Sequence, residues 1–164
     1  MVDGAPPGAT DLRTFFCGTS FFGGLAPPMV DRMMGLLKER RFPKGATIFK
    51  EGENGSSMYI VRSGSLLIAR RCSDGSDVRL LMIRKGDHFG VTALIEMEAR
   101  AFSCVAEEES VLYELTNADL YQFYKTDPKA YILLLQNISR ELCRRLRKAA
   151  VRIAALEDAL HKPP

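Results

Sequence analysis

The residues with the clearest chemical potential lie between Phe89 and Ala106, in the sequence FGVTALIEMEARAFSCVA. Gly90 can adopt backbone angles that are closed to other residues, which lets a ligand approach the main chain. We expect a short helix that starts near Thr92, and the unpaired N–H groups of its first turn would attract an anion. Arg100 adds a permanently charged guanidinium whose fork of donors matches phosphate oxygens. The segment therefore predicts a phosphate-binding pocket.

The sequence GDHFGVTALIEMEARAFSCVA, which starts at Gly86, also resembles a known motif. It is similar to the phosphate-binding cassette of cyclic nucleotide-binding domains, approximately G-D-x-F-G-E-x-A-L-L, a few variable residues, then R-x-A-[ST]-V-x-A. The similarity continues in RFPKGATIFKEGENGSSMYIVRSGSL, which matches the opening of the family's barrel, and spans about residues 21–125. The cassette positions in register are Phe89, Gly90, Ala93, Leu94, Ile95, Arg100, Ala101, Ser103 and Ala106.

The resemblance implies a ligand site for cAMP or cGMP, with no catalytic residue, no metal and no cofactor. Phe102 stands where the family usually has a small residue; we interpret it as a packing side chain, with a narrowed pocket or stacking on a base as the alternatives. Ser103 is a candidate contact to phosphate or to a purine edge. The implied ligand-binding residues are Phe89, Gly90, Val91, Thr92, Ala93, Leu94, Arg100, Ala101, Phe102 and Ser103.

Val91 is the main departure from the family pattern. In the family a glutamate follows Phe-Gly and accepts the ribose 2′-hydroxyl, whereas valine offers no acceptor. Losing a hydrogen bond to a charged group costs about 1.5–3 kcal/mol, or roughly ten- to a hundredfold in affinity. Glu96 and Glu98 are alternative ribose partners, but we interpret both as solvated loop carboxylates. Weak cyclic nucleotide binding, a different anionic ligand and a degenerate pocket all remain open.

The composition is that of an ordinary globular chain of 164 residues, with 46% hydrophobic and 26% charged residues. A net charge of +3 does not by itself imply nucleic-acid binding. The uncharged segment 14–30 allows a signal sequence, but its glycines and Pro27-Pro28 argue against one, and no apolar run approaches the ~18 residues of a membrane span. We therefore expect a soluble cytoplasmic protein without membrane association. Scattered cysteines without a Cys-x-x-Cys pair fit a reducing compartment: Cys17, Cys72, Cys104 and Cys143.

Enzymatic activity is not expected. The chain contains only two histidines, His88 and His161, which disfavours the metal-binding jelly-roll enzymes that need a histidine cluster. EGENGSS lacks the Gly-Lys-[Ser/Thr] ending of a nucleotide P-loop, and no Ser/His/Asp or Cys/His set is indicated. His88 and Cys104, beside the cassette, are interpreted as structural or exposed rather than as haem or redox sensors.

The middle of the chain predicts a sheet-rich fold. Short runs rich in β-branched, aromatic and leucine residues alternate with glycine, and Asp74-Gly75 is a strong hairpin signal. This pattern of short runs favours a β-sandwich or jelly-roll barrel. The resemblance implies a more specific fold class: mainly β with flanking helices. That fold is a double-stranded β-helix (jelly-roll) cyclic nucleotide-binding barrel with a long C-terminal helix. The runs are ATIFK, SMYIVRS, SLLIARR, DVRLLMI, FSCVA and SVLYEL.

Helical periodicity flanks this region. We expect helices from Pro28 to about Arg40, from Asn117, and from Pro128 to Leu160, the last about 50 Å long at ~1.5 Å per residue. The domain boundaries that follow are a flexible N-terminal segment over 1–20 with a loose tail over 1–13, a β-roll domain with its N-terminal helix over 21–126, and a long dimerisation helix over 127–162. The apolar seam of the long helix is Leu135, Ile138, Leu142, Leu146, Ala149, Ile153, Leu156 and Leu160.

A second copy of the chain is the simplest partner for this seam, which predicts a homodimer. The basic run from Arg140 to Arg152 indicates either contact with nucleic acid, acidic lipid or an acidic partner, or the solvated flank of the dimer, and we favour the flank. Because the sequence ends at Pro164, we expect no DNA-binding module and no DNA binding. The function predicted is a cyclic nucleotide sensor in bacterial-type signal transduction. The alternative is a degenerate domain that dimerises and docks a downstream protein.

Overall fold

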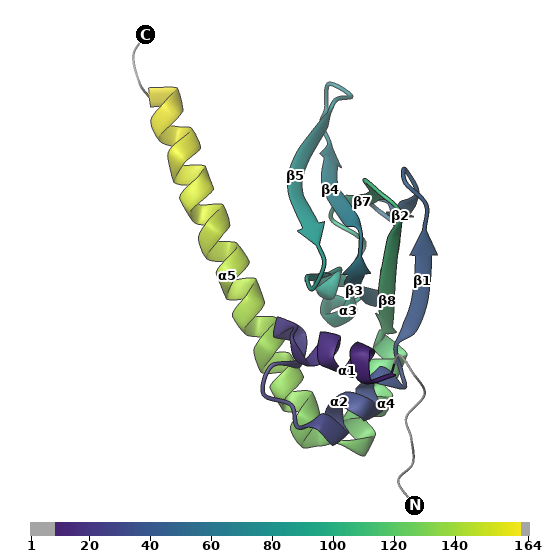
Figure 1. Cartoon of the computed structure of the whole chain (residues 1–164). Helices are drawn as coiled ribbons and strands as arrows, with labels where there is room; N and C mark the ends of the chain where they lie inside the picture. Colours follow the sequence, from purple (N-terminus) through teal and green to yellow (C-terminus); the bar gives the residue numbers. More distant parts are fainter. Residues whose placement is uncertain (1–8, 162–164) are drawn as a thin grey trace, which may run out of the picture.

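The computed structural model describes residues 9–161, in which two four-stranded sheets face each other and the helices gather at one end (Figure 1). In chain order the elements are α1 (Ala9–Cys17), the 3-10 helix η1 (Ser20–Phe22), α2 (Pro27–Met34), β1 (Lys38–Phe42), β2 (Thr47–Phe49), β3 (Ser57–Ser63), β4 (Ser65–Arg71), β5 (Asp77–Arg84), β6 (His88–Phe89), α3 (Val91–Glu96), β7 (Ser103–Ala106), β8 (Ser110–Thr116), α4 (Asn117–Thr126) and α5 (Pro128–His161).

The two sheets have strand orders β1-β8-β3-β6 and β2-β7-β4-β5, and every strand pair is antiparallel. Because side chains alternate between the two faces of a strand, one face of each sheet contributes to a shared apolar core. The expected mainly β jelly-roll with flanking helices is confirmed, with the strands paired in two separate sheets rather than one closed barrel. The core between the sheets is Phe49, Tyr59, Val61, Leu66, Ile83, Phe89, Cys104, Ala106 and Leu112.

A second apolar cluster lies between the first sheet and the helices. Phe16 and Phe22 are completely or almost completely buried there, and the Phe16 ring meets Tyr113 of β8 edge-on, with the centroids 5.0 Å apart. Leu134 and Ile138 from the start of α5 complete the cluster. The helices therefore cover the outer face of the first sheet and leave the second sheet without a helical layer.

Two expectations about the N-terminal region are wrong. The helix expected from Pro28 to Arg40 ends at Met34, and the charged segment Lys38–Phe42 forms strand β1. This strand lies at the edge of its sheet, where charged side chains reach solvent and pair across to β8, as Arg40 does with Glu114 at 2.8 Å. The tail expected to be loose over residues 1–13 is helical from residue 9 onward. The helix is held in place by Phe16, whose side chain is buried in the core. The rest of that expectation, residues 1–8, lies outside the described residues.

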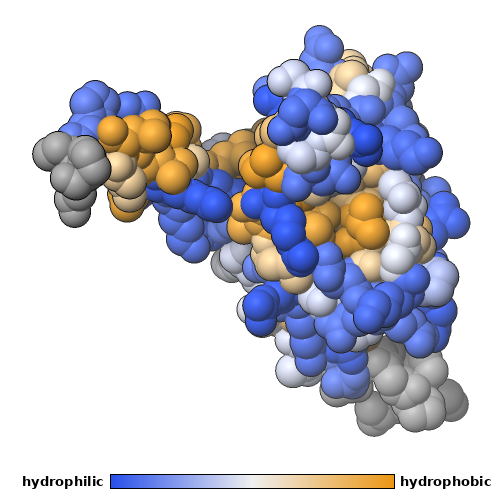
Figure 2. All heavy atoms as spheres, turned by 90° about the horizontal axis from the view of Figure 1, so that it is seen from above, coloured by the Kyte–Doolittle hydropathy of each residue, from blue (hydrophilic) through white to orange (hydrophobic). Residues whose placement is uncertain are grey.

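The long helix α5 spans Pro128–His161, as expected from its N-cap aspartate and periodicity. The buried residues of this helix all lie in its first three turns: Ala130, Leu134, Asn137 and Ile138. The remainder extends away from the helical end of the molecule, and its apolar side chains are visible on the surface (Figures 1 and 2). Over the described residues, no helix combines the length and apolarity required for a membrane span.

Asn137 fastens α5 to the N-terminal region. Its buried amide donates to the carbonyls of Phe21, at 3.0 Å, and Gly23, at 2.7 Å. The first bond provides a donor for the buried Phe21 carbonyl, and the second holds the turn that follows η1.

Replacing Asn137 with alanine is expected to lower the free energy of unfolding by about 1–3 kcal/mol, because the buried Phe21 carbonyl loses its donor. Chemical denaturation measures the change. Gln136→Ala is the matched control, since Gln136 is exposed on the same helix. Equal stability of the two variants would contradict this account of how α5 is attached.

Candidate functional site

The candidate site is built where β6 turns into α3. Gly90 forms the N-cap of α3 with a left-handed backbone, φ 77°, as expected from the sequence. The helix is only six residues long and begins at Val91, one residue before the expected start. The chain then turns at Met97, which also has a positive φ of 54°, and returns into β7 past Arg100. This geometry brings the backbone of residues 89–91 and the side chain of Arg100 together.

Arg100 is the central side chain of the site. It is only 7% exposed, and its Nη2 donates to the Ser57 carbonyl at 2.8 Å and to the Ser57 hydroxyl at 3.4 Å. Its Nη1 donates to the Gly90 carbonyl at 3.2 Å, and the guanidinium lies over the Phe49 ring, 4.2 Å from the centroid. Burial lowers the pKa of Arg100, yet an arginine remains charged at neutral pH.

The partners of Arg100 are neutral groups. Within residues 9–161, no carboxylate forms a salt bridge with it. Removing a cation from water costs several kcal/mol, which neutral acceptors offset only in part. The site therefore holds a buried positive charge that an anion would neutralise.

Two glycines make room for this arginine. A Cβ atom at Gly55 would lie 2.7 Å from Arg100 Nε and 2.5 Å from the Cβ of Ala93. A Cβ atom at Gly90 would lie 2.8 Å from Arg100 Nη1. Any larger residue at either position would displace the guanidinium. Gly90 was identified from the sequence as part of the site, whereas Gly55, which lies in EGENGSS, was not.

Aromatic rings support the guanidinium from the core side. Phe49, Tyr59 and Phe89 come from three different strands, and their ring centroids are 5.4–6.3 Å apart. The Tyr59 hydroxyl accepts from the Ser57 hydroxyl at 3.4 Å and donates to Glu114 at 3.3 Å. Burial raises the pKa of Tyr59, so its phenol stays protonated at neutral pH.

Sequence reasoning missed Phe49, Ser57 and Tyr59 as parts of the site. Strand alternation in SMYIV places Ser57 and Tyr59 on the same face of β3, which is the one signal in the sequence that groups them. Their proximity to Arg100 depends on contacts between segments more than forty residues apart.

The remaining predicted site residues occupy several environments. Val91, 5% exposed, and Leu94 are buried in the apolar cluster beneath the helices, so the position that lacks the ribose-binding glutamate faces that cluster. Ala93 is also buried, against Gly55. Thr92 and Ala101 are exposed and Phe102 is 39% exposed, while the Ser103 hydroxyl accepts from the Glu51 amide at 3.0 Å.

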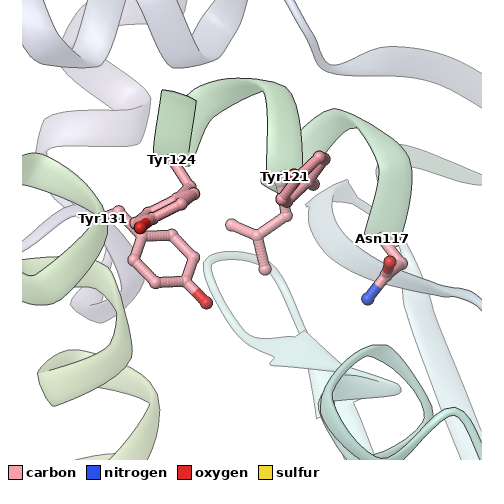
Figure 3. Close-up of a pocket in the computed structure, with 5 residues that line it drawn as sticks. Asn117, Tyr121, Tyr124 and Tyr131 are labelled. Atoms are coloured by element: carbon pink, nitrogen blue, oxygen red, sulfur yellow. The ribbon is translucent and has the colours of Figure 1, made fainter. Parts of the chain in front are cut away.

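A separate pocket lies between α4 and the start of α5 (Figure 3). It is lined by Asn117, Leu120, Tyr121, Tyr124 and Tyr131 and shares no residue with the Arg100 site. The Asn117 amide donates to the Leu94 carbonyl at 2.9 Å and thereby connects α4 to the end of α3. The backbone N–H of Asn117 also donates to the Ser56 carbonyl at 2.7 Å, so the pocket is linked to α3 and to the start of β3.

The model of the cyclic nucleotide-binding domain family matches residues 39–127, which include β1 to α4 and the whole Arg100 site. The chain belongs to the cyclic nucleotide-binding domain family. The family match covers more than half of the chain and therefore confirms the resemblance seen in the cassette.

Relatives in this family include regulators and kinases. The chain is 32% identical over 139 residues to the cyclic AMP receptor protein of Thermus thermophilus, covering 85% of this chain and 62% of that protein. It is 29% identical over 135 residues to a CRP-like cAMP-activated global transcriptional regulator of Mycobacterium tuberculosis, covering 82% of this chain and 58% of that protein. A cGMP-dependent protein kinase of Toxoplasma gondii is 35% identical over 99 residues, 60% of this chain and 10% of the kinase. The chain thus spans about three-fifths of the two bacterial regulators.

Solved structures agree with the fold. The catabolite activator protein of Thermus thermophilus superposes with a TM-score of 0.75 at 31% identity, covering 85% of this chain and 63% of that chain. A cyclic nucleotide-binding domain from Methylobacillus flagellatus superposes with a TM-score of 0.80 at 19% identity, covering 89% of this chain and 82% of that chain. The second likeness concerns the fold alone.

His88 and Cys104 are buried and neutral, as the structural interpretation of both residues requires. Burial raises the pKa of the Cys104 thiol to about 12, so it is not a reactive thiolate. His88 packs against the Phe21 ring with the centroids 5.4 Å apart, and its Nδ1 has no hydrogen-bond partner in the described part of the chain. Burial, reinforced by the nearby Arg145, lowers the pKa of His88 from an ordinary 6.5 to about 4.

This lowered pKa predicts a pH-dependent stability. Below about pH 6.5 the unfolded chain binds a proton at His88, whereas the folded chain does so only near pH 4, so stability falls as the pH falls through this window. The loss should reach about 3 kcal/mol. His88→Gln should remove that part of the slope in denaturation measured from pH 7 to pH 4, and His161→Gln, at an exposed position, should not. Parallel curves for wild type and His88→Gln would refute the assignment.

Proposed function

We propose that the chain binds cAMP or cGMP at the Arg100 site and acts as a non-catalytic regulatory module. The observation that carries the proposal is the buried guanidinium of Arg100, held by neutral carbonyls and an aromatic ring beside the left-handed Gly90. A cyclic phosphate supplies the negative charge that this arrangement lacks. The names of the relatives support the ligand class, since one is a cyclic AMP receptor protein and another a cGMP-dependent kinase.

The phosphate half of the site has its arginine, and the sugar half is altered. Val91 provides no acceptor for a ribose hydroxyl and is buried with Leu94. The proposal therefore includes weaker nucleotide binding than a site with a carboxylate would provide, and a different anionic ligand is the alternative. The four free cysteines fit a regulatory protein of the reducing cytoplasm.

Arg100→Leu is expected to weaken cyclic nucleotide binding by at least about tenfold, because it removes charge-assisted hydrogen bonds to the phosphate. Calorimetric titration of wild type and variant with cAMP and cGMP provides the measurement. Arg84→Leu is the control, since Arg84 is an exposed arginine at the end of β5. Absence of binding heat for both nucleotides in the wild type would reject the proposed ligands, and equal affinities of wild type and Arg100→Leu would reject the site.

The second part of the proposal is a homodimer formed through α5. Apolar side chains, Ala149 among them, are spaced three or four residues apart on the part of this helix that leaves the body of the protein, where Leu146 is 71% exposed and Leu160 is 80% exposed (Figure 2). Such a stripe on a solvated helix is typical of a coiled-coil seam. A second copy of α5 offers the same stripe and would bury both.

Ile153→Glu is expected to convert the dimer into a monomer at micromolar concentration, because it places a charge in the middle of the seam. Sedimentation velocity measures the molecular mass in solution. Ala154→Glu adds the same charge one residue along, away from the seam, and should leave the dimer intact. A wild-type chain that sediments as a monomer would disprove this part of the proposal.

A further inference from the structure

Strand β6 separates the Arg100 site from the long helix. Its two residues point to opposite faces, as alternation along a strand requires. Phe89 faces the inter-sheet core, where its ring stacks on Tyr59. Its centroid lies 6.0 Å from that of the Phe49 ring, over which the Arg100 guanidinium lies. His88 faces the other way and packs on Phe21. Gly90 follows directly, so any displacement of this strand moves the backbone of the proposed anion site.

On the outer side, β6 is attached to α5 by one arginine. Arg145 Nη2 donates to the His88 carbonyl at 2.5 Å, and its Nε donates to Glu141 at 2.9 Å. Glu141 lies one turn earlier on the same helix and also pairs with Arg144 at 2.7 Å. The carboxylate thus holds Arg145 in the orientation that reaches the strand.

This contact is a main attachment of the middle of α5. After Ile138, Glu141 and Arg145 are the only residues of α5 that are not exposed. One further contact follows on the same side of the helix, where Arg152 donates to the Leu80 carbonyl of β5 at 3.2 Å. The basic run therefore has a role that its sequence did not predict, because two of its arginines bind backbone carbonyls of the edge strands β5 and β6.

We propose that Arg145, oriented by Glu141, is a positioning residue for the anion site that couples ligand binding to the placement of α5. The proposal rests on the proposed function. Arg145 fixes the His88 carbonyl, two residues before the Gly90 carbonyl that holds Arg100, and does not itself contact Arg100. Because coupling between two equilibria is reciprocal, the factor by which this contact strengthens ligand binding equals the factor by which the ligand strengthens the contact.

The first experiment tests the contact without ligand. Arg145→Met should raise hydrogen exchange of the amides that pair β3 with β6 and with the residue before it. One of these is the Val61 amide, which donates to the Asp87 carbonyl at 3.0 Å. The expected rise is about fivefold or more. Arg147→Met is the matched control, because Arg147 is an exposed arginine on the same helix without a hydrogen bond or ion pair in residues 9–161. Unchanged exchange in Arg145→Met, or an equal rise in Arg147→Met, would overturn the proposal, whether or not a nucleotide binds.

The second experiment tests the coupling by titrating the same proteins with cAMP and cGMP. Arg145→Met should weaken binding about fivefold or more, and Glu141→Gln should weaken it by a smaller factor in the same direction, while Arg147→Met binds as the wild type does. If Arg147→Met loses as much affinity as Arg145→Met, the effect is one of net charge and the coupling is refuted. Wild-type affinity in Arg145→Met would refute it as well. A wild type that binds neither nucleotide would instead reject the proposed ligands, and the exchange measurement would still decide whether Arg145 positions β6.

Discussion

The constraint around which this molecule is organised is a buried cation that forms no salt bridge with any carboxylate of residues 9–161. Arg100 is held by the Ser57 and Gly90 carbonyls and by the Phe49 ring, and the glycines at 55 and 90 leave it the necessary space. Each of these groups is neutral, so the charge is positioned but not neutralised. An anion that enters the site gains an electrostatic interaction in a partly desolvated environment, where it is stronger than in water.

The same geometry offers the proposed binding event inside the sheets a route to the outside of the molecule. β6 is two residues long, with one side chain on each face, so it is in contact with the Arg100 site and with the helical layer at once. On the outer side, α5 is joined to the turn around η1 by Asn137 and to β6 itself by Arg145. These polar contacts are few and directional, unlike the broad apolar packing at the start of α5.

Much of this organisation is predictable from the sequence, and the failures have physical reasons. Glycine punctuation and β-branched runs locate β2, β3, β4, β5, β7 and β8, and the N-cap and periodicity locate α5. The two-residue strand β6 was not predicted, because it is too short to show alternation. Strand β1 was missed because it is an edge strand whose charged residues mimic a solvated helix. The inward orientation of Val91 and the contact of Ser57 with Arg100 depend on long-range packing, for which local patterns carry no signal.

The central claim is that Arg100 and Gly90 together bind the phosphate of a cyclic nucleotide, and nuclear magnetic resonance tests it most directly. The Gly90 backbone amide and the Arg100 Nε–H group are monitored in one titration with cAMP or cGMP. If both groups bind the same phosphate, both signals shift with a common saturation curve and a common dissociation constant. If neither signal shifts at millimolar nucleotide, or if they saturate at different concentrations, the site does not bind the phosphate as described.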